Sequence, residues 1–133
     1  MKLLITGSRK FDNYEALKNA IEEVEKLQKE KITMLLHGGA IGADTLAQKW
    51  ADGNEIPTQI IKPNYKNHTN KTAPLIRNKE LVKLAECTLA LYVKNRTGGT
   101  WFTSQETIKA NKPLYEYLGK EKLIYTAPLK MLF

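Results

Sequence analysis

The sequence predicts a single α/β domain with a doubly wound parallel sheet of about five strands. Its length of 133 residues favours one domain over two. From the first residue to about residue 117, apolar runs of strand length alternate with stretches that have the period of a helix. Strands and helices that alternate in this way are joined by right-handed crossovers, and helices then cover both faces of the sheet.

The first half of the chain holds three expected strands and two expected helices. The apolar run at residues 3–5 predicts a short strand, and residues 13–29 place apolar side chains three to four positions apart, which predicts one helical stripe. ITMLL predicts a buried strand that ends at His37. The next helix carries alanines, a leucine and Trp50 on one face, and Gly53 is placed to stop it. PTQIIKP is the third expected strand.

The second half continues the alternation. Pro74 at a first-turn position opens a helix that runs to about Leu84. TLALYV predicts the fourth strand, residues 101–110 the last helix, and PLYEY the fifth strand. The C-terminal extension, residues 119–133, is apolar enough to dock on the body of the domain or on a neighbouring subunit, and the sequence favours neither. The commonest strand order, 3-2-1-4-5, reverses between strands 1 and 4, where ligands bind at the carboxyl ends.

Composition excludes several classes of protein. Cys87 is the only cysteine, which rules out a disulfide framework and favours a reducing, cytoplasmic location. The opening apolar run is too short for a signal peptide or a membrane span, so no membrane partner is expected. The net charge of +7 favours polyanions, including nucleotides and nucleic acid. Many lysines nevertheless alternate with acidic residues, as in EEVEKLQKEK, which is typical of a solvated helix face.

Glycine is concentrated in three turns that are expected to meet. TGSR, HGGAIGAD and RTGGT follow the expected strands 1, 2 and 4, and together they hold six of the eight glycines. Glycine allows positive φ and lets a ligand approach the N–H groups at a helix N-terminus, which attract anions. Two of these turns lead directly into a helix. The pattern favours a bound nucleotide phosphate, while tight strand-to-helix turns without a ligand remain the alternative.

Polar side chains beside these glycines are candidates for ligand contact. Ser8 and Arg9 leave the first strand where a hydroxyl and a guanidinium group can bind phosphate or ribose oxygens. Arg77 and Asn78 lie in the first turn of the Pro74 helix and can point back over the crevice. The alternative for these residues is an ordinary place on the surface of the protein.

Two further residues have a double interpretation. Asp44 can cap its helix or accept hydrogen bonds from a ribose hydroxyl, and Thr100 can cap its helix or bind phosphate. Trp101 can stack on a base, make a subunit contact or pack in the ordinary way. His37 and His68 have no ligand partners at metal-binding spacing, so we expect no metal. No resident cofactor is expected, and the catalytic residues of any reaction are unknown.

The turns contain neither a Walker A motif nor a complete G-x-G-x-x-G, which leaves ATP hydrolysis and dinucleotide redox chemistry poorly supported. Taken together, however, ITGSR, HGGAIGADTLAQKWA, IRN and RTGGT resemble the small YspA-like branch of the SLOG superfamily, over about residues 1–117. Relatives include the LOG phosphoribohydrolases, the DNA-processing protein DprA and sensor domains of antiphage systems. The resemblance implies a Rossmann-like, SLOG-type domain that binds a nucleotide at the crevice.

The resemblance extends the candidate site residue by residue. It matches the first-strand motif, the G-G-A-x-G-A-D segment, the later R-N pair and the final G-G-T. The residues that we expect to contact the ligand are Gly7, Ser8, Arg9, His37, Gly38, Gly39, Gly42, Ala43, Asp44, Arg77, Asn78, Gly98, Gly99 and Thr100.

Three functions are compatible with this site. The leading hypothesis is a protein that binds an NAD-derived, ADP-ribose-type or cyclic nucleotide, as a sensor or as a sponge of the kind a phage would use against host defence. The second is a phosphoribohydrolase, although LOG enzymes resemble P-G-G-x-G-T-x-x-E, and here the first carboxylate after Thr100 is Glu106, nearly two helical turns away. The third, less favoured, is DprA-like binding of single-stranded DNA. The resemblance also implies a homo-oligomer.

Overall fold

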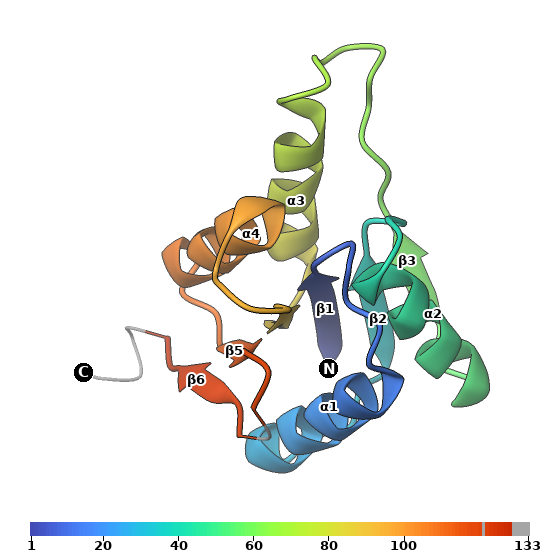
Figure 1. The fold of residues 1–133 in the computed structure, drawn as a ribbon, viewed down its shortest axis with the longest axis vertical. Helices are drawn as coiled ribbons and strands as arrows, with labels where there is room; N and C mark the ends of the chain where they lie inside the picture. Colours follow the sequence, from blue (N-terminus) through green and yellow to red (C-terminus); the bar gives the residue numbers. More distant parts are fainter. Residues whose placement is uncertain (121, 129–133) are drawn as a thin grey trace.

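A six-stranded sheet with helices on both faces forms the domain (Figure 1). The structure is a computed structural model and describes residues 1–120 and 122–128. The strand order is β3-β2-β1-β4-β5-β6, in which the first five strands run parallel and β6 runs antiparallel to β5. The expected order 3-2-1-4-5 is therefore confirmed.

The strands are β1 (Lys2–Gly7), β2 (Met34–His37), β3 (Thr58–Ile60), β4 (Cys87–Leu91), β5 (Leu114–Tyr117) and β6 (Ile124–Thr126). The helices are α1 (Tyr14–Gln28), α2 (Ala43–Gly53), α3 (Ala73–Leu84) and α4 (Gly98–Lys109). The last helix begins earlier than the expected residue 101, so the two glycines of RTGGT form its first turn.

The C-terminal extension adds a sixth strand to the roughly five that the sequence predicts. Residues 124–126 pair with β5, and the ring of Tyr125 stacks on that of Tyr115 with centroids 4.7 Å apart. Leu123 is buried beneath this pairing. Within the described residues the extension therefore docks on the body of the domain. Residues 129–133, which the expectation of an oligomer contact also included, lie outside the described residues.

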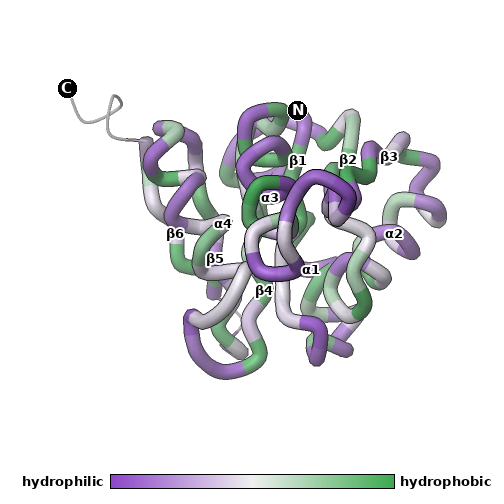
Figure 2. The backbone as a smooth tube through the Cα atoms, turned by 90° about the horizontal axis from the view of Figure 1, so that it is seen from above, coloured by the Kyte–Doolittle hydropathy of each residue, from purple (hydrophilic) through white to green (hydrophobic). Residues whose placement is uncertain are grey.

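The two faces of the sheet are covered differently. Helices α1 and α2 lie on one face (Figure 1). Apolar side chains such as Leu17 and Trp50 form the larger core there, and Figure 2 shows the hydropathy of the chain along both helices. Helices α3 and α4 lie on the other face. Under α4 this face is polar, since Thr107 donates a hydrogen bond to Thr88 across 2.9 Å and Ser104 is bonded to Tyr92. Burial of these hydroxyl groups costs little because each has a partner.

This arrangement opens a crevice between β1 and β4. The two strands pair in parallel as far as Gly7 and Leu91, and the N–H of Ser8 donates to the carbonyl of Leu91 at 3.0 Å. After that point one chain turns towards α1 and the other towards α4, on opposite faces of the sheet. Diverging loops at such a reversal leave a ligand-sized space at the carboxyl ends of the strands.

Candidate functional site

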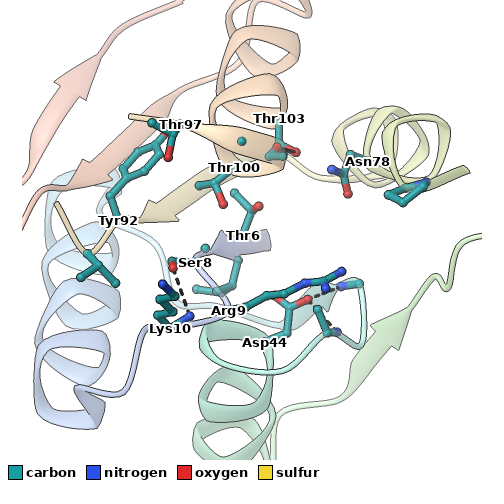
Figure 3. A pocket seen from close by; sticks show the side chains of 18 of the residues that line it. Thr6, Ser8, Arg9, Lys10, Asp44, Asn78, Tyr92, Thr97, Thr100 and Thr103 are labelled. Atoms are coloured by element: carbon teal, nitrogen blue, oxygen red, sulfur yellow. Dashed lines mark hydrogen bonds between the residues drawn. The ribbon is translucent and has the colours of Figure 1, made fainter. Parts of the chain in front are cut away.

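A cavity of about 800 Å³ lies at the carboxyl ends of β1 and β4 (Figure 3). Its walls come from the loops after β1, β2 and β4 and from the first turns of α3 and α4. Most of the residues expected to contact a ligand line this cavity: Gly7, Ser8, Arg9, Gly38, Asp44, Arg77, Asn78, Gly98, Gly99 and Thr100.

The remaining expected residues are placed elsewhere. His37 and Gly39 line a neighbouring hollow of about 470 Å³ on the other side of the loop after β2. The N–H of Gly39 donates to Nδ1 of His37 at 3.0 Å, and Nε2 of the same ring pairs with Gln48 at 2.6 Å. Gly42 and Ala43 pack against the loop after β1, where the N–H of Ala43 donates to the carbonyl of Ser8.

Glycines in the first two loops make room for other parts of the chain. Gly42 has a φ of +81°, and a Cβ atom there would lie 2.5 Å from the carbonyl oxygens of Ser8 and Arg9. A Cβ atom at Gly38 would overlap the guanidinium group of Arg77. These glycines therefore allow two loops and one long side chain to pack closely, rather than admitting a ligand to the backbone.

Glycines at the start of α4 face open space instead. Among the described residues, no atom lies within 4 Å of a Cβ built on Gly98, and the Cβ of Gly99 would have one neighbour, Asn78 Nδ2 at 3.7 Å. No side chain caps this helix. The first N–H groups of a helix have no partner inside it, so this first turn presents donors to the cavity.

Asp44 holds the loop after β2 in shape. Its Oδ2 atom accepts hydrogen bonds from the N–H groups of Gly38 and Ala40, both at 3.1 Å. The N-cap of α2 is Gly42, so Asp44 caps the preceding loop and not its own helix. Oδ1 of Asp44 forms no hydrogen bond with the described residues. Every buried side-chain oxygen of the described residues has a hydrogen-bond partner. Oδ1 is therefore not fully buried and is accessible to solvent or to a ligand. Asp44 lines both this cavity and the neighbouring hollow beside His37, and in Figure 3 its side chain extends from α2 towards the cavity.

Burial raises the pKa of the Asp44 carboxyl above its usual value of 3.8. Its hydrogen bonds from the loop and its electrostatic interactions with His37 and Arg77 oppose that rise. Burial also lowers the pKa of the Arg77 guanidinium. The positive charge of Arg9 lowers this pKa further, whereas the Asp44 carboxylate raises it. Two guanidinium groups thus lie close enough to interact across a cavity that contains one carboxylate.

Arg77 connects α3 to the ends of two strands. Its Nη1 donates to the carbonyl oxygens of Gly38 at 2.6 Å and Ile61 at 3.3 Å, and its Nε donates to Asn78 Oδ1 at 2.6 Å. Because Oδ1 of Asn78 is the acceptor, its Nδ2 is left to face the cavity as a donor (Figure 3). Arg77 therefore positions the walls of the site in addition to lining it.

Several lining residues were not expected from the sequence. They are Thr6, Lys10, Tyr92, Lys94, Thr97 and Thr103, among others. Their signal was weak, because threonines in a strand or helix are read as structural and lysines in loops as solvated. Arg96 was also missed: it forms two hydrogen bonds, at 2.8 and 3.1 Å, with the buried carboxylate of Glu116 and so fixes the loop before α4. A glutamate inside the apolar strand PLYEY was the available signal.

Similarity to known proteins agrees with this geometry. The model of the YspA, cpYpsA-related SLOG family matches residues 1–68, just over half of the chain. The chain belongs to this SLOG family. The match covers the loops after β1 and β2 of the SLOG domain, whereas the motifs of α3 and α4 lie beyond it, so the resemblance expected to residue 117 is supported over a shorter span.

The SLOG chain is also similar to the Gene 61 protein of Mycobacterium phage D29, with 27% identity over 124 residues. The aligned region covers 90% of this chain and 98% of the phage protein. No solved structure matches.

Other acidic and potentially metal-binding groups lie outside the SLOG cavity. Glu106 forms an ion pair with Lys109 at 3.5 Å and does not line the cavity. In residues 1–120 and 122–128, no three His, Cys, Asp or Glu side chains gather in a way that could hold a metal ion. None of the helices in the described part of the chain is long and apolar enough to span a membrane.

Proposed function

We propose that this SLOG domain binds a nucleotide or nucleotide-derived signalling molecule, and that it acts as a sensor or as a sequestering protein. The observation that carries this proposal is the first turn of α4, where Gly98 and Gly99 leave uncapped N–H groups open to the cavity. A phosphate group bound there would be stabilised by these donors and by the positive end of the helix dipole.

The charges around the cavity support an anionic ligand. Arg9, Lys10 and Lys94 line it together with Arg77, against the single carboxylate of Asp44 among the described lining residues. The cavity volume of about 800 Å³ is within the usual range for small-molecule sites. Apolar surface from Pro74 and Leu75 completes the lining and gives a base a surface to pack against.

A role that needs binding alone is supported by the extent of the phage relative. The Gene 61 protein aligns with this chain over 98% of its own length, so that relative has little sequence outside the aligned domain. A small binding domain of this kind can lower the free concentration of a nucleotide signal without further machinery.

Native mass spectrometry of the full chain with AMP, NAD, ADP-ribose and cyclic nucleotides tests the proposal. We expect at least one nucleotide to bind and to be recovered intact after denaturation. Arg9→Ala should weaken that binding roughly tenfold or more, because a charged hydrogen bond is lost. Lys18→Ala removes the same charge from an exposed position on α1 and is the matched control. Equal binding by the two variants, or no bound nucleotide, would contradict the proposal.

A hydrolase is the second candidate, and the presence of Asp44 in the cavity favours it. Cleavage of an N-glycosidic bond needs a group that can activate water or stabilise the ribose as the base leaves. Asp44 lines the cavity and Glu106 does not. If the recovered ligand is free base plus ribose 5-phosphate, we expect Asp44→Asn to abolish the release and Glu106→Ala to leave it unchanged.

A further inference from the structure

We infer that the cavity selects ribonucleotides, with Asp44 accepting a hydrogen bond from a ribose hydroxyl while the phosphate lies at the first turn of α4. This inference rests on the proposed function and deepens it, because it names the sugar that the site recognises and the residue that recognises it.

The two oxygens of Asp44 have separate tasks. Oδ2 accepts both N–H groups of the loop after β2, at 3.1 Å each, so its hydrogen-bonding capacity is used within the protein. Oδ1 has no partner among the described residues, although Asp44 is only 7% exposed, and the residue borders both the cavity and the hollow beside His37. An acceptor held this firmly and left unpaired in a cavity is an incomplete hydrogen bond that a ligand can complete.

The opposite wall has the complementary character. Asn78 is 8% exposed, and its amide is oriented by Arg77 so that Nδ2 faces the cavity near Gly99. Its donors therefore add to the N–H groups of α4 and favour an acceptor such as a phosphate oxygen. A carboxylate repels phosphate, so Asp44 requires a neutral or cationic donor on the same ligand.

A ribose 5-phosphate unit combines these two requirements. Its phosphate is an acceptor, and its 2- and 3-hydroxyls are donors on the same rigid ring. Carboxylates are known partners of ribose hydroxyls in α/β nucleotide sites. Asp44 is bonded to the N–H groups of Gly38 and Ala40 and lies near the charge of Arg77, surroundings that suit a polar sugar. The apolar surface for a base, Pro74 and Leu75, is on α3.

Base-free probes test this inference without knowledge of the base. Methyl β-D-ribofuranoside 5-phosphate and its 2-deoxy and 3-deoxy analogues are titrated into the full chain and followed by NMR, with inorganic phosphate as the reference anion. We expect at least one deoxy analogue to bind roughly tenfold more weakly than the ribose compound, because the missing hydroxyl group leaves the Asp44 carboxylate without a hydrogen-bond donor. Equal affinity of all three sugars would overturn the inference and leave the proposed function standing. If neither the sugars nor phosphate bind at millimolar concentration, the inference is overturned, and the nucleotide panel then decides whether the proposed function stands.

Asp44→Asn assigns the selectivity to this residue. The variant keeps the shape of the side chain and loses the charged acceptor. Ribose and deoxyribose compounds should therefore bind to it with about equal affinity. Asp52→Asn, on the same helix and outside the cavity, should keep the wild-type preference. A wild-type preference in Asp44→Asn would overturn the assignment. If that variant does not fold, as judged by circular dichroism, the comparison of sugars on the wild-type chain decides.

Discussion

Two glycine-bearing loops border the same cavity, yet their glycines have different structural roles. In the loop after β2, Gly38 and Gly42 are surrounded by protein, one by a guanidinium group and the other by backbone carbonyls. At the end of the loop after β4, in the first turn of α4, Gly98 faces open space and Gly99 has one neighbour at ordinary contact distance, Asn78. A glycine-rich sequence therefore does not by itself locate a ligand. The distinction lies in what occupies the place of the missing Cβ atom.

This difference separates stability from binding. A side chain at the first loop must displace neighbouring atoms, so its cost appears in the free energy of unfolding. A side chain at the start of α4 displaces nothing in the protein and occupies space that a ligand would use. Substitutions in the two loops should therefore have opposite signatures in unfolding and binding experiments.

The largest effect on stability is expected for Gly42→Ala. An alanine there must adopt a φ of +81° and bring its Cβ within 2.5 Å of two backbone carbonyl oxygens. We expect the free energy of unfolding to fall by roughly 2–4 kcal/mol, measured by urea denaturation. Gly53→Ala, at the end of α2 with no described atom near the new methyl group, should change stability by less than about 1 kcal/mol. Equal losses in both variants would show that the loops after β1 and β2 do not pack as described.

A smaller loss of stability is expected for Gly38→Ala. The obstructing group is the end of the flexible Arg77 side chain, which can move away but then loses its bonds to the carbonyl of Gly38 and to Asn78. We expect a loss of about 1–2 kcal/mol in the same unfolding experiment. In an Arg77→Ala background the Gly38 substitution should cost much less, because the clash is gone. Additive losses in this double-mutant cycle would contradict direct contact between the two residues.

The strand and helix order could be predicted because it depends on the spacing of apolar residues along the chain. β6 could not, since a three-residue strand at 124–126 exists only through its pairing with β5 and the stacking of Tyr125 on Tyr115. The start of α4 was placed too late for a related reason. Glycines favour turns in any local reading, whereas α4 begins at Gly98. The loop before it is held by the bond between Arg96 and Glu116, which are distant in the sequence.

The candidate site shows the same division. Its place at the carboxyl ends of β1 and β4 follows from topology, and so most lining residues could be named from the sequence. The N–H groups that Asp44 binds could not be predicted from the sequence, because they depend on the course of the loop after β2, in which Gly39 and Gly42 have positive φ. Thr6 and Thr103 were missed because only the packing of β1 against α4 turns their hydroxyl-bearing faces to one cavity.

Acidification should reveal the state of Asp44. Because burial raises its pKa above 3.8, the carboxylate is protonated at a higher pH in the folded chain than in the unfolded one. The preference for ribose over deoxyribose should therefore disappear on acidification with a midpoint above pH 3.8, as measured by titrating the two sugar phosphates at each pH. His37 and Arg77 lie near this carboxyl, and their electrostatic interactions with it limit the rise. Asp44→Asn should show no such pH dependence.

Linkage gives the sign of the accompanying change in stability. Because the pKa of Asp44 is higher in the folded chain than in the unfolded one, the folded chain binds the proton more tightly. The contribution of Asp44 to the free energy of unfolding is therefore largest below its unfolded pKa. It is lost as the pH rises through its folded pKa. Relative to Asp44→Asn, the wild-type chain should therefore gain stability as pH falls towards 3.8. A relative loss in urea denaturation over that range would mean that the hydrogen bonds of Oδ2, and not burial, dominate the carboxyl.

The smallest effect on stability, together with a large effect on binding, is expected for Gly99→Ala. Gly98 has a φ of +68°, which alanine adopts at a cost, whereas Gly99 is helical without positive φ. An alanine at Gly99 should change the free energy of unfolding by less than about 0.5 kcal/mol, because its helix propensity offsets the ordinary contact with Asn78. Its methyl group would nevertheless lie where we place the phosphate, so nucleotide affinity should fall at least roughly tenfold, while Gly53→Ala binds as the wild type does. If a stable Gly99→Ala chain binds nucleotide with unchanged affinity, the phosphate does not lie at α4 and must be placed nearer to Arg9 and Arg77. The glycines of the two loops would then differ in their packing but not in their part in binding.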